Sequence, residues 1–221
     1  AWRNDIADRS GTRPHGGGVM GQNTSSAVMQ QRKEPHDSLD YFPTPPWATR
    51  ALCEHVIGGL GLDRFDCWEP ACGEGHMAQT LAEYFNYVYA SDVHDYGAQG
   101  QGIQDFLMYG AHPPKPFRER LEWIITNPPF RLGMEFVLNM LDRASCGAAV
   151  LVRTAFLEGK LRHSELFTRY PPHTVAQFVE RVAIVKGRVD KEVSSATAYC
   201  WIVWRTDELR VLPLPELKTR F

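Results

Sequence analysis

The chain has 221 residues, 43% of them apolar, and a formal net charge of -2. This length favours one well-buried domain with appendages over two domains. The charge excludes a globally basic nucleic-acid binder but leaves room for a local basic patch. The five cysteines form no C-x-x-C pair, so the sequence favours reduced thiols over disulfide bonds or a zinc site.

The first part of the chain differs in composition from the rest. Residues 1–37 are poor in large apolar side chains, so we predict a flexible tail there and a single domain over 38–221. Met20, inside this tail, is a candidate start residue.

The sequence has no apolar run of about 18 to 20 residues and no signal-peptide pattern. We therefore expect a soluble, cytoplasmic protein without a membrane partner.

Helix and strand patterns alternate along the domain. Thr44 is a predicted N-cap for a helix that ends near Gly58. An apolar run up to Trp68 predicts the first strand, and apolar residues at helical spacing predict a helix after residue 75. The remaining predicted elements are strands at 87–93, 102–107 and 121–126, a helix at 133–144, a strand at 147–156 and a short helix at 164–170.

Two β-rich runs, 174–185 and 197–205, close the domain without a helix between them. They are typical of an antiparallel hairpin. The alternation before them predicts a doubly wound α/β domain with a mostly parallel sheet. Ligands of such domains bind at the carboxyl ends of the strands.

The segment EPACGEG, residues 69–75, lies between the first strand and its helix, where such folds bind nucleotides. Gly73 and Gly75 let the backbone approach a ligand closely. Nineteen residues after Gly73, Asp92 ends the second strand, where a carboxylate accepts hydrogen bonds from ribose hydroxyls. The pattern E-x-x-x-G-x-G favours a ligand without a phosphate, such as S-adenosylmethionine, over a dinucleotide. The alternative is an ordinary tight turn.

Further contacts to this ligand follow from the same topology. Glu69 or Glu74, together with the amides of the turn, can bind the charged amino-acid end of S-adenosylmethionine. Asp105 and Phe106 end the third predicted strand, where a carboxylate can bind the adenine by a hydrogen bond and a ring can stack on it.

The fourth predicted strand ends in Asn-Pro-Pro-Phe, residues 127–130. An exocyclic amino group is a poor nucleophile, and two acceptors that hold its N–H groups favour the tetrahedral nitrogen that attacks a methyl group. Asn127 offers its side-chain oxygen and Pro128 its carbonyl, while Pro129 helps to stiffen the loop. Phe130 offers a ring for base stacking, worth about 1 to 3 kcal/mol. The alternative is a strand that ends at prolines with a core phenylalanine.

Five motifs resemble, in order, those of amino-group DNA methyltransferases, chiefly the N6-adenine class. They are FPTPP at 42–46, EPACGEG at 69–75, SDV at 91–93, QDFL at 104–107 and TNPPF at 126–130. The resemblance covers residues 40–157. It implies a class I methyltransferase fold, Rossmann-like, with a seven-stranded sheet whose last strand is reversed, which agrees with the predicted hairpin.

The resemblance also implies roles for individual residues. The methionine end of S-adenosylmethionine would contact Tyr41, Phe42, Thr44, Glu69, Ala71, Gly73 and Gly75. Asp92 with its neighbour Val93 would bind the ribose, Asp105 and Phe106 the adenine, and residues 127–130 the target amine. Such DNA enzymes usually carry a sizeable target-recognition domain, for which this chain has no room. Specificity is therefore low, or short loops or a partner read the target.

Residues 151–191 carry eight Lys or Arg against four acidic residues, a local excess that could track phosphates. The segment 185–199 is a candidate recognition loop. The candidate nucleic-acid contacts are Arg153, Lys186, Arg188 and Lys191. The alternative is a solvated hairpin loop. The histidines have no metal-ligand spacing, so we expect no metal.

The favoured function is methylation of adenine N6 in DNA by a small, phage-type enzyme. Three alternatives remain open: methylation of RNA bases such as those of rRNA, methylation of a protein glutamine, and a catalytically silent nucleic-acid adaptor of the same fold. The sequence leaves open the choice between adenine and cytosine and the strandedness of the substrate.

Overall fold

A computed structural model describes residues 40–119, 121–185, 188–189 and 197–206 of the chain. The predicted tail at 1–37 lies outside these residues, as do Lys186, Lys191 and most of the predicted recognition loop.

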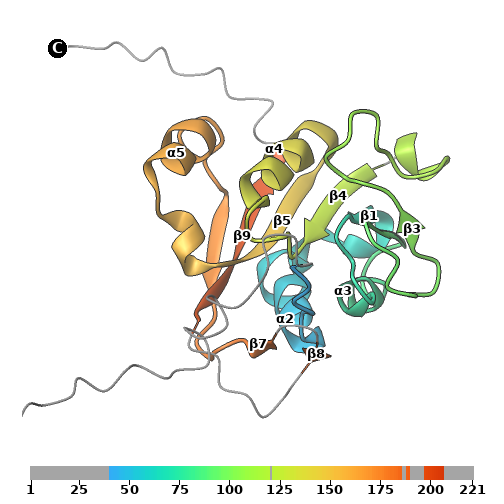
Figure 1. Cartoon of the computed structure of the whole chain (residues 1–221), viewed down its shortest axis with the longest axis horizontal. Helices are drawn as coiled ribbons and strands as arrows, with labels where there is room; N and C mark the ends of the chain where they lie inside the picture. Colours follow the sequence, from blue (N-terminus) through green and yellow to red (C-terminus); the bar gives the residue numbers. More distant parts are fainter. Residues whose placement is uncertain (1–39, 120, 186–187, 190–196, 207–221) are drawn as a thin grey trace, which may run out of the picture. The chain divides into compact units, whose positions relative to one another are not determined.

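Seven strands form one sheet in the order β3-β2-β1-β4-β5-β9-β6 (Figure 1). The strands are β1 (Asp66–Glu69), β2 (Tyr87–Asp92), β3 (Gly102–Ile103), β4 (Leu121–Thr126), β5 (Gly147–Arg153), β6 (Thr174–Gln177) and β9 (Tyr199–Arg205). The first five pair in parallel, and β9 runs antiparallel to both β5 and β6. The doubly wound sheet with a reversed last strand is thus confirmed.

Short helices flank the sheet. The α-helices are α2 (Pro46–Ala51), α3 (His76–Leu81), α4 (Gly133–Arg143) and α5 (Lys160–Arg162). Two π-helical segments, η1 (Leu52–Val56) and η6 (His163–Phe167), continue α2 and α5. The 3-10 turns are η2 (Gly58–Leu60), η3 (Leu62–Arg64), η4 (Phe117–Glu119) and η5 (Thr154–Leu157). A separate small hairpin pairs β7 (Ile184–Val185) with β8 (Arg188–Val189).

The period of two along the strands divides the core into two layers. One set of alternating residues, including Trp123 and Trp201, packs against α2, η1 and α3. The other set, including Trp68 and Trp204, packs against α4 and η6. The indole of Trp201 donates a hydrogen bond of 2.9 Å to the carbonyl of Ala48, which docks α2 on its face of the sheet. Because helices cover both faces of the sheet, the loops that can bind a ligand lie at the carboxyl ends of the parallel strands.

The structure differs from the sequence prediction at several boundaries. The strand predicted over 102–107 is only two residues long, and the strand predicted over 147–156 ends at Arg153 and turns into η5. Thr44 is not the N-cap of α2, because Pro45 holds that position without a side-chain cap. The run 174–185 contributes only its first four residues to the sheet, as β6.

Candidate active site

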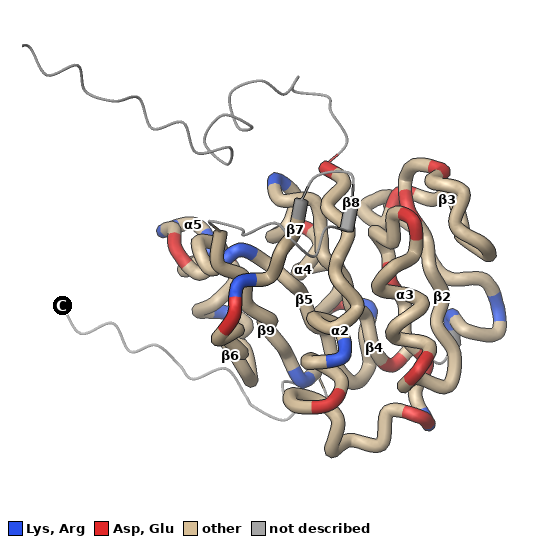
Figure 2. The backbone as a smooth tube through the Cα atoms, turned by 90° about the horizontal axis from the view of Figure 1, so that it is seen from below, with Lys and Arg blue, Asp and Glu red and all other residues tan. Residues whose placement is uncertain are grey.

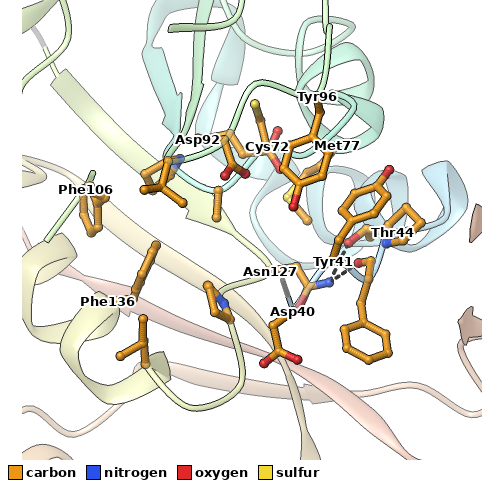
Figure 3. A pocket seen from close by; sticks show the side chains of 18 of the residues that line it. Asp40, Tyr41, Thr44, Cys72, Met77, Asp92, Tyr96, Phe106, Asn127 and Phe136 are labelled. Atoms are coloured by element: carbon orange, nitrogen blue, oxygen red, sulfur yellow. Dashed lines mark hydrogen bonds between the residues drawn. The ribbon is translucent and has the colours of Figure 1, made fainter. Parts of the chain in front are cut away.

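A pocket lies where the parallel strands end. Its walls come from the segment before α2, the turn after β1, the segments after β2, β3 and β4, and the start of α4 (Figure 3). The sequence-predicted residues that line it are Tyr41, Phe42, Thr44, Glu69, Ala71, Asp92, Val93, Asp105, Phe106, Asn127 and Pro129. Gly73, Gly75, Pro128 and Phe130 flank these residues in the chain without being part of the lining.

The glycine turn after β1 packs against Tyr41. Gly73 has a φ of 53°, and a Cβ at this position would overlap the Tyr41 ring. Both the backbone conformation and the close approach therefore require glycine. The Tyr41 ring also stacks at a tilt on Tyr96, with 4.7 Å between ring centroids.

Asp92 ties the end of β2 to the same turn. Its Oδ2 accepts the N–H of Gly73 at 2.9 Å, and its Oδ1 accepts the N–H of His94 at 3.2 Å. Burial raises the pKa of this carboxyl, although the backbone N–H groups of Gly73, His94 and Val93 oppose the shift. Each carboxylate oxygen can accept two hydrogen bonds, so Asp92 can still accept one from a ligand hydroxyl.

Glu69 ends β1 and is only 2% exposed. Its Oε2 has no hydrogen-bond partner within the part of the chain that the structure describes. Burial raises the pKa of this carboxyl well above its ordinary value; a hydrogen bond from the Ala78 backbone acts against the shift. A buried carboxylate is costly unless a cation or a donor pairs with it. Glu69 is therefore suited to bind a cationic group of a ligand.

Asn127, directly after β4, is held by the FPTPP segment. Its Nδ2 donates to the carbonyl of Phe42 at 2.9 Å and to Oγ1 of Thr44 at 3.2 Å (Figure 3). Since a carbonyl can only accept, the amide nitrogen must face Phe42, and the amide oxygen must point away from it. This oxygen is buried and lacks a hydrogen-bond donor among the described residues. The structure thus leaves a fixed acceptor available beside the pocket.

The ring of Phe130 packs against other side chains. The guanidinium carbon of Arg153 lies 3.8 Å from its centroid, and the ring centroid of Phe42 lies 4.8 Å away. The Phe130 N–H donates to Oδ2 of Asp40 at 3.0 Å. A base that stacks on Phe130 has to compete with Arg153 for the ring, so the stacking role stays a prediction.

Asp105 and Phe106 lie beyond the short β3. Oδ1 of Asp105 accepts the N–H of Leu107 at 2.9 Å, and the exposed carboxylate can accept further hydrogen bonds. Phe106 is 1% exposed and packs between Trp68 and Phe136, with 5.0 Å between its centroid and each of theirs. Its predicted contact with adenine is therefore limited to the small part of the ring that reaches the pocket.

Acidic side chains gather around the pocket. Among the described residues that line it are four carboxylates, those of Asp40, Glu69, Asp92 and Asp105, and no Lys or Arg. Such a lining favours a cationic ligand over one that carries phosphates.

Sequence reasoning did not assign several residues that line the pocket: Asp40, Pro43, Pro70, Cys72, His76, Met77, Tyr96, Leu107, Leu132 and Phe136. Pro43, Pro70, Cys72 and Leu107 lie inside the predicted motifs, and most of the others lie within a few residues of one. Tyr96 gave no such signal, because it reaches the pocket from a loop of irregular backbone. Cys72 is buried, and burial raises the pKa of its thiol, so it is a poor nucleophile.

Of the predicted nucleic-acid contacts, the structure describes the side chain of Arg153 alone. It packs on Phe130, and its Nε is buried without a hydrogen-bond partner among the described residues. Arg188 lies in β8, where only the backbone is described. Nearby, Arg162 donates to the carbonyl of Phe156 and Arg169 pairs with Glu165. Basic and acidic residues are interspersed over the described backbone (Figure 2). The phosphate contacts therefore stay predictions.

No helix among the described residues is long and apolar enough to cross a membrane. They also contain no group of three or more His, Cys, Asp or Glu side chains that could hold a metal ion.

No protein-family model and no curated protein matches the sequence. Solved structures share its fold. A protein from Pyrococcus horikoshii described as an RNA methyltransferase has a TM-score of 0.57 at 13% identity, over 81% of this chain and 95% of that one. The methyltransferase subunit of a type I restriction-modification system from Streptococcus thermophilus has a TM-score of 0.54 at 14% identity, over 74% of this chain and 44% of that one. Magnesium protoporphyrin IX methyltransferase from Synechocystis, with bound S-adenosylmethionine, has a TM-score of 0.50 at 9% identity, over 72% and 78%.

The strand order and these likenesses define the fold as that of the class I methyltransferases. The chain spans less than half the length of the restriction-modification subunit. The three neighbours differ in the substrates that their names give, and at such low identities the likeness shows the fold alone. The reaction has to be argued from the residues of this pocket.

Proposed function

We propose that the protein transfers a methyl group from S-adenosylmethionine to an exocyclic amino group of a nucleic-acid base, with adenine N6 in DNA as the first candidate. This proposal rests mainly on the hydrogen bonding of the Asn127 side chain. Both N–H groups of its amide are bound by Phe42 and Thr44, and its buried oxygen has no donor among the described residues. A fixed acceptor without a protein partner suits an N–H of a target amine.

The pocket suits S-adenosylmethionine in charge and in hydrogen bonding. This donor carries a sulfonium and an ammonium, and the lining supplies four carboxylates. Glu69, whose Oε2 has no hydrogen-bond partner among the described residues, would bind the ammonium, Asp92 the ribose hydroxyls and Asp105 the adenine amino group. When bound, the donor supplies an electrophilic methyl group, and the protein's own residues orient the acceptor toward it.

The choice of a nucleic-acid base rests on the NPPF loop. Pro128 and Pro129 restrict the backbone on either side of their peptide bond, so Asn127 is presented by a stiff segment. A flipped or unpaired base offers a planar amine that can reach such a recessed acceptor. The motifs that resemble N6-adenine enzymes favour DNA, while a protein glutamine offers a chemically similar amide.

The proposal is tested by incubating the purified full chain with tritiated S-adenosylmethionine and, separately, with single-stranded DNA, duplex DNA, rRNA and a protein extract. We expect label in DNA. Label confined to RNA would move the target to an RNA base, and label confined to protein would contradict the proposal. Asn127→Ala protein serves as the background in each incubation.

Glu69→Gln is expected to stabilise the free protein while weakening donor binding. Burial raises the pKa of Glu69, so the folded state holds this proton more tightly than the unfolded state does. The stabilisation from this tighter proton binding is complete at pH values below the pKa of Glu69 in the unfolded chain. It is lost as the pH rises through the pKa of Glu69 in the folded protein. Each unit of the shift corresponds to about 1.4 kcal/mol. Gln carries no charge, so the variant should avoid this loss.

Urea unfolding of both proteins between pH 4 and pH 9 measures this effect. The stability of the variant relative to the wild type should rise with pH, and calorimetry at pH 8 should show weaker binding of S-adenosylmethionine. The exposed Glu158 provides the control, since Glu158→Gln should change neither quantity. A pH-independent stability difference together with unchanged donor affinity would contradict the role assigned to Glu69.

A further inference from the structure

Asp40 is a pocket residue that belongs to none of the motifs found in the sequence. It lines the pocket together with Asn127, and Figure 3 shows its carboxylate just below the Asn127 amide in that view. Its Oδ2 accepts the N–H of Phe130 at 3.0 Å. Because Pro128 and Pro129 have no N–H, Phe130 provides the first backbone donor after Asn127. Asp40 therefore holds the far end of the NPPF loop.

The segment 40–44 and the NPPF loop at 127–130 are joined at both ends. Asn127 donates to Phe42 and Thr44 at one end, and Phe130 donates to Asp40 at the other. This arrangement fixes the Asp40 carboxylate relative to the amide oxygen of Asn127. The loop uses Oδ2 of Asp40, and this contact does not involve the second carboxylate oxygen, Oδ1.

A second acceptor is needed if two N–H groups of a target amine are to be held. The sequence pointed to the Pro128 carbonyl, which stays a prediction, and Asp40, which lines the pocket, is another candidate. A carboxylate is also a stronger acceptor than a carbonyl and can take up a proton. Asp40 therefore combines a hydrogen-bond acceptor with a base, which the Pro128 carbonyl cannot do.

We propose that Asp40 is a catalytic residue whose Oδ1 accepts one N–H of the target amine and takes up the proton released on methylation. This inference rests on the proposed function. In the transfer, the amine nitrogen forms a bond to the methyl carbon, and the carbon–sulfur bond breaks with its electron pair remaining on sulfur. The nitrogen then holds one proton too many, which passes to Asp40 and from there to water.

Two substitutions separate this role from simple support of the loop. Asp40→Asn keeps an oxygen that can accept the Phe130 N–H but loses the charge and the basicity, whereas Asp40→Ala loses both functions. We expect kcat to fall by about 100-fold or more in both variants, with little change in KM for the nucleic acid. The affinity of the protein, saturated with S-adenosylhomocysteine, for deoxyadenosine should fall about 10-fold in Asp40→Ala.

Asp95 provides the matched control. Its Oδ1 also accepts a backbone N–H, that of Gly97 at 2.8 Å, and Asp95 is not part of the pocket lining. Asp95→Asn should keep the wild-type kcat and the wild-type affinity for deoxyadenosine.

The outcomes distinguish this inference from the proposed function. A wild-type kcat in Asp40→Asn would mean that Asp40 only supports the loop, whether or not Asp40→Ala is impaired. This result would overturn the inference and leave the proposed function standing. A wild-type protein that neither methylates any nucleic acid nor binds deoxyadenosine would overturn both. Loss of kcat in both Asp40 variants, with donor binding intact by calorimetry, would support the inference.

Discussion

Replacing Asn127 with alanine is expected to lower methyl transfer by about 100- to 1,000-fold, the usual effect of removing one well-oriented polar group from an active site. The substitution removes the buried acceptor and the two hydrogen bonds to Phe42 and Thr44. Donor binding, measured by calorimetry, should change much less, because the residues proposed to hold the donor come mainly from the segments after β1, β2 and β3. Initial rates with tritiated donor give the comparison.

Asn139 is the control for this substitution. It lies half-buried on α4, outside the pocket lining. Its Nδ2 donates to the carbonyl of Glu135, and its Oδ1 accepts a hydrogen bond from Arg143. Asn139→Ala should therefore retain methyl transfer while losing side-chain hydrogen bonds of the same kind. Retained turnover in Asn127→Ala would falsify the role given to Asn127.

Gly73→Ala is expected to lower the affinity for S-adenosylmethionine by at least about 10-fold and to destabilise the free protein by about 1 to 3 kcal/mol. The added Cβ would overlap the Tyr41 ring, and the φ of 53° is unfavourable for alanine. The turn and Tyr41 cannot both keep their places, so the donor site should be distorted. Calorimetry and urea unfolding measure the two effects.

Gly75 offers a matched comparison in the same turn. It also has a positive φ, of 84°, but the nearest side-chain atom to an added Cβ is that of Ala98 at an ordinary 3.5 Å. Gly75→Ala should therefore show backbone strain alone, about 1 to 2 kcal/mol. In a double-mutant cycle, Tyr41→Ala should relieve part of the Gly73→Ala defect and none of the Gly75→Ala defect. Equal effects at both glycines would contradict the importance of the Tyr41 contact.

The sheet was largely predictable because its signals are local. Buried parallel strands such as β4 and β5 read as continuous apolar runs, and the missing helix before β9 indicated the reversed strand. Strand lengths were less predictable. The segment after Ile103 leaves the sheet because Phe106 turns inward between Trp68 and Phe136, a packing choice that residues 102–107 alone do not encode.

The candidate site likewise contains features that local sequence patterns predicted and contacts that they did not. The spacing predicted a ligand-binding turn at Gly73 and Gly75 together with Asp92, and the structure adds the hydrogen bond from Gly73 to Asp92. The contacts from Thr44 to Asn127 and from Asp40 to Phe130 span 83 and 90 residues. Such pairings depend on how the chain folds back on itself, so no local pattern could reveal them. Thr44 shows the difference, since its sequence position favoured a helix cap and its hydroxyl accepts a hydrogen bond from Asn127 instead.

Mass analysis of nucleosides from DNA incubated with the protein and S-adenosylmethionine identifies the atom that receives the methyl group. We expect N6-methyldeoxyadenosine with the wild-type protein and none with Asn127→Ala. A methyl group on a ring carbon, or on no base of DNA or RNA while a protein becomes labelled, would contradict the claim that this pocket methylates a base amine.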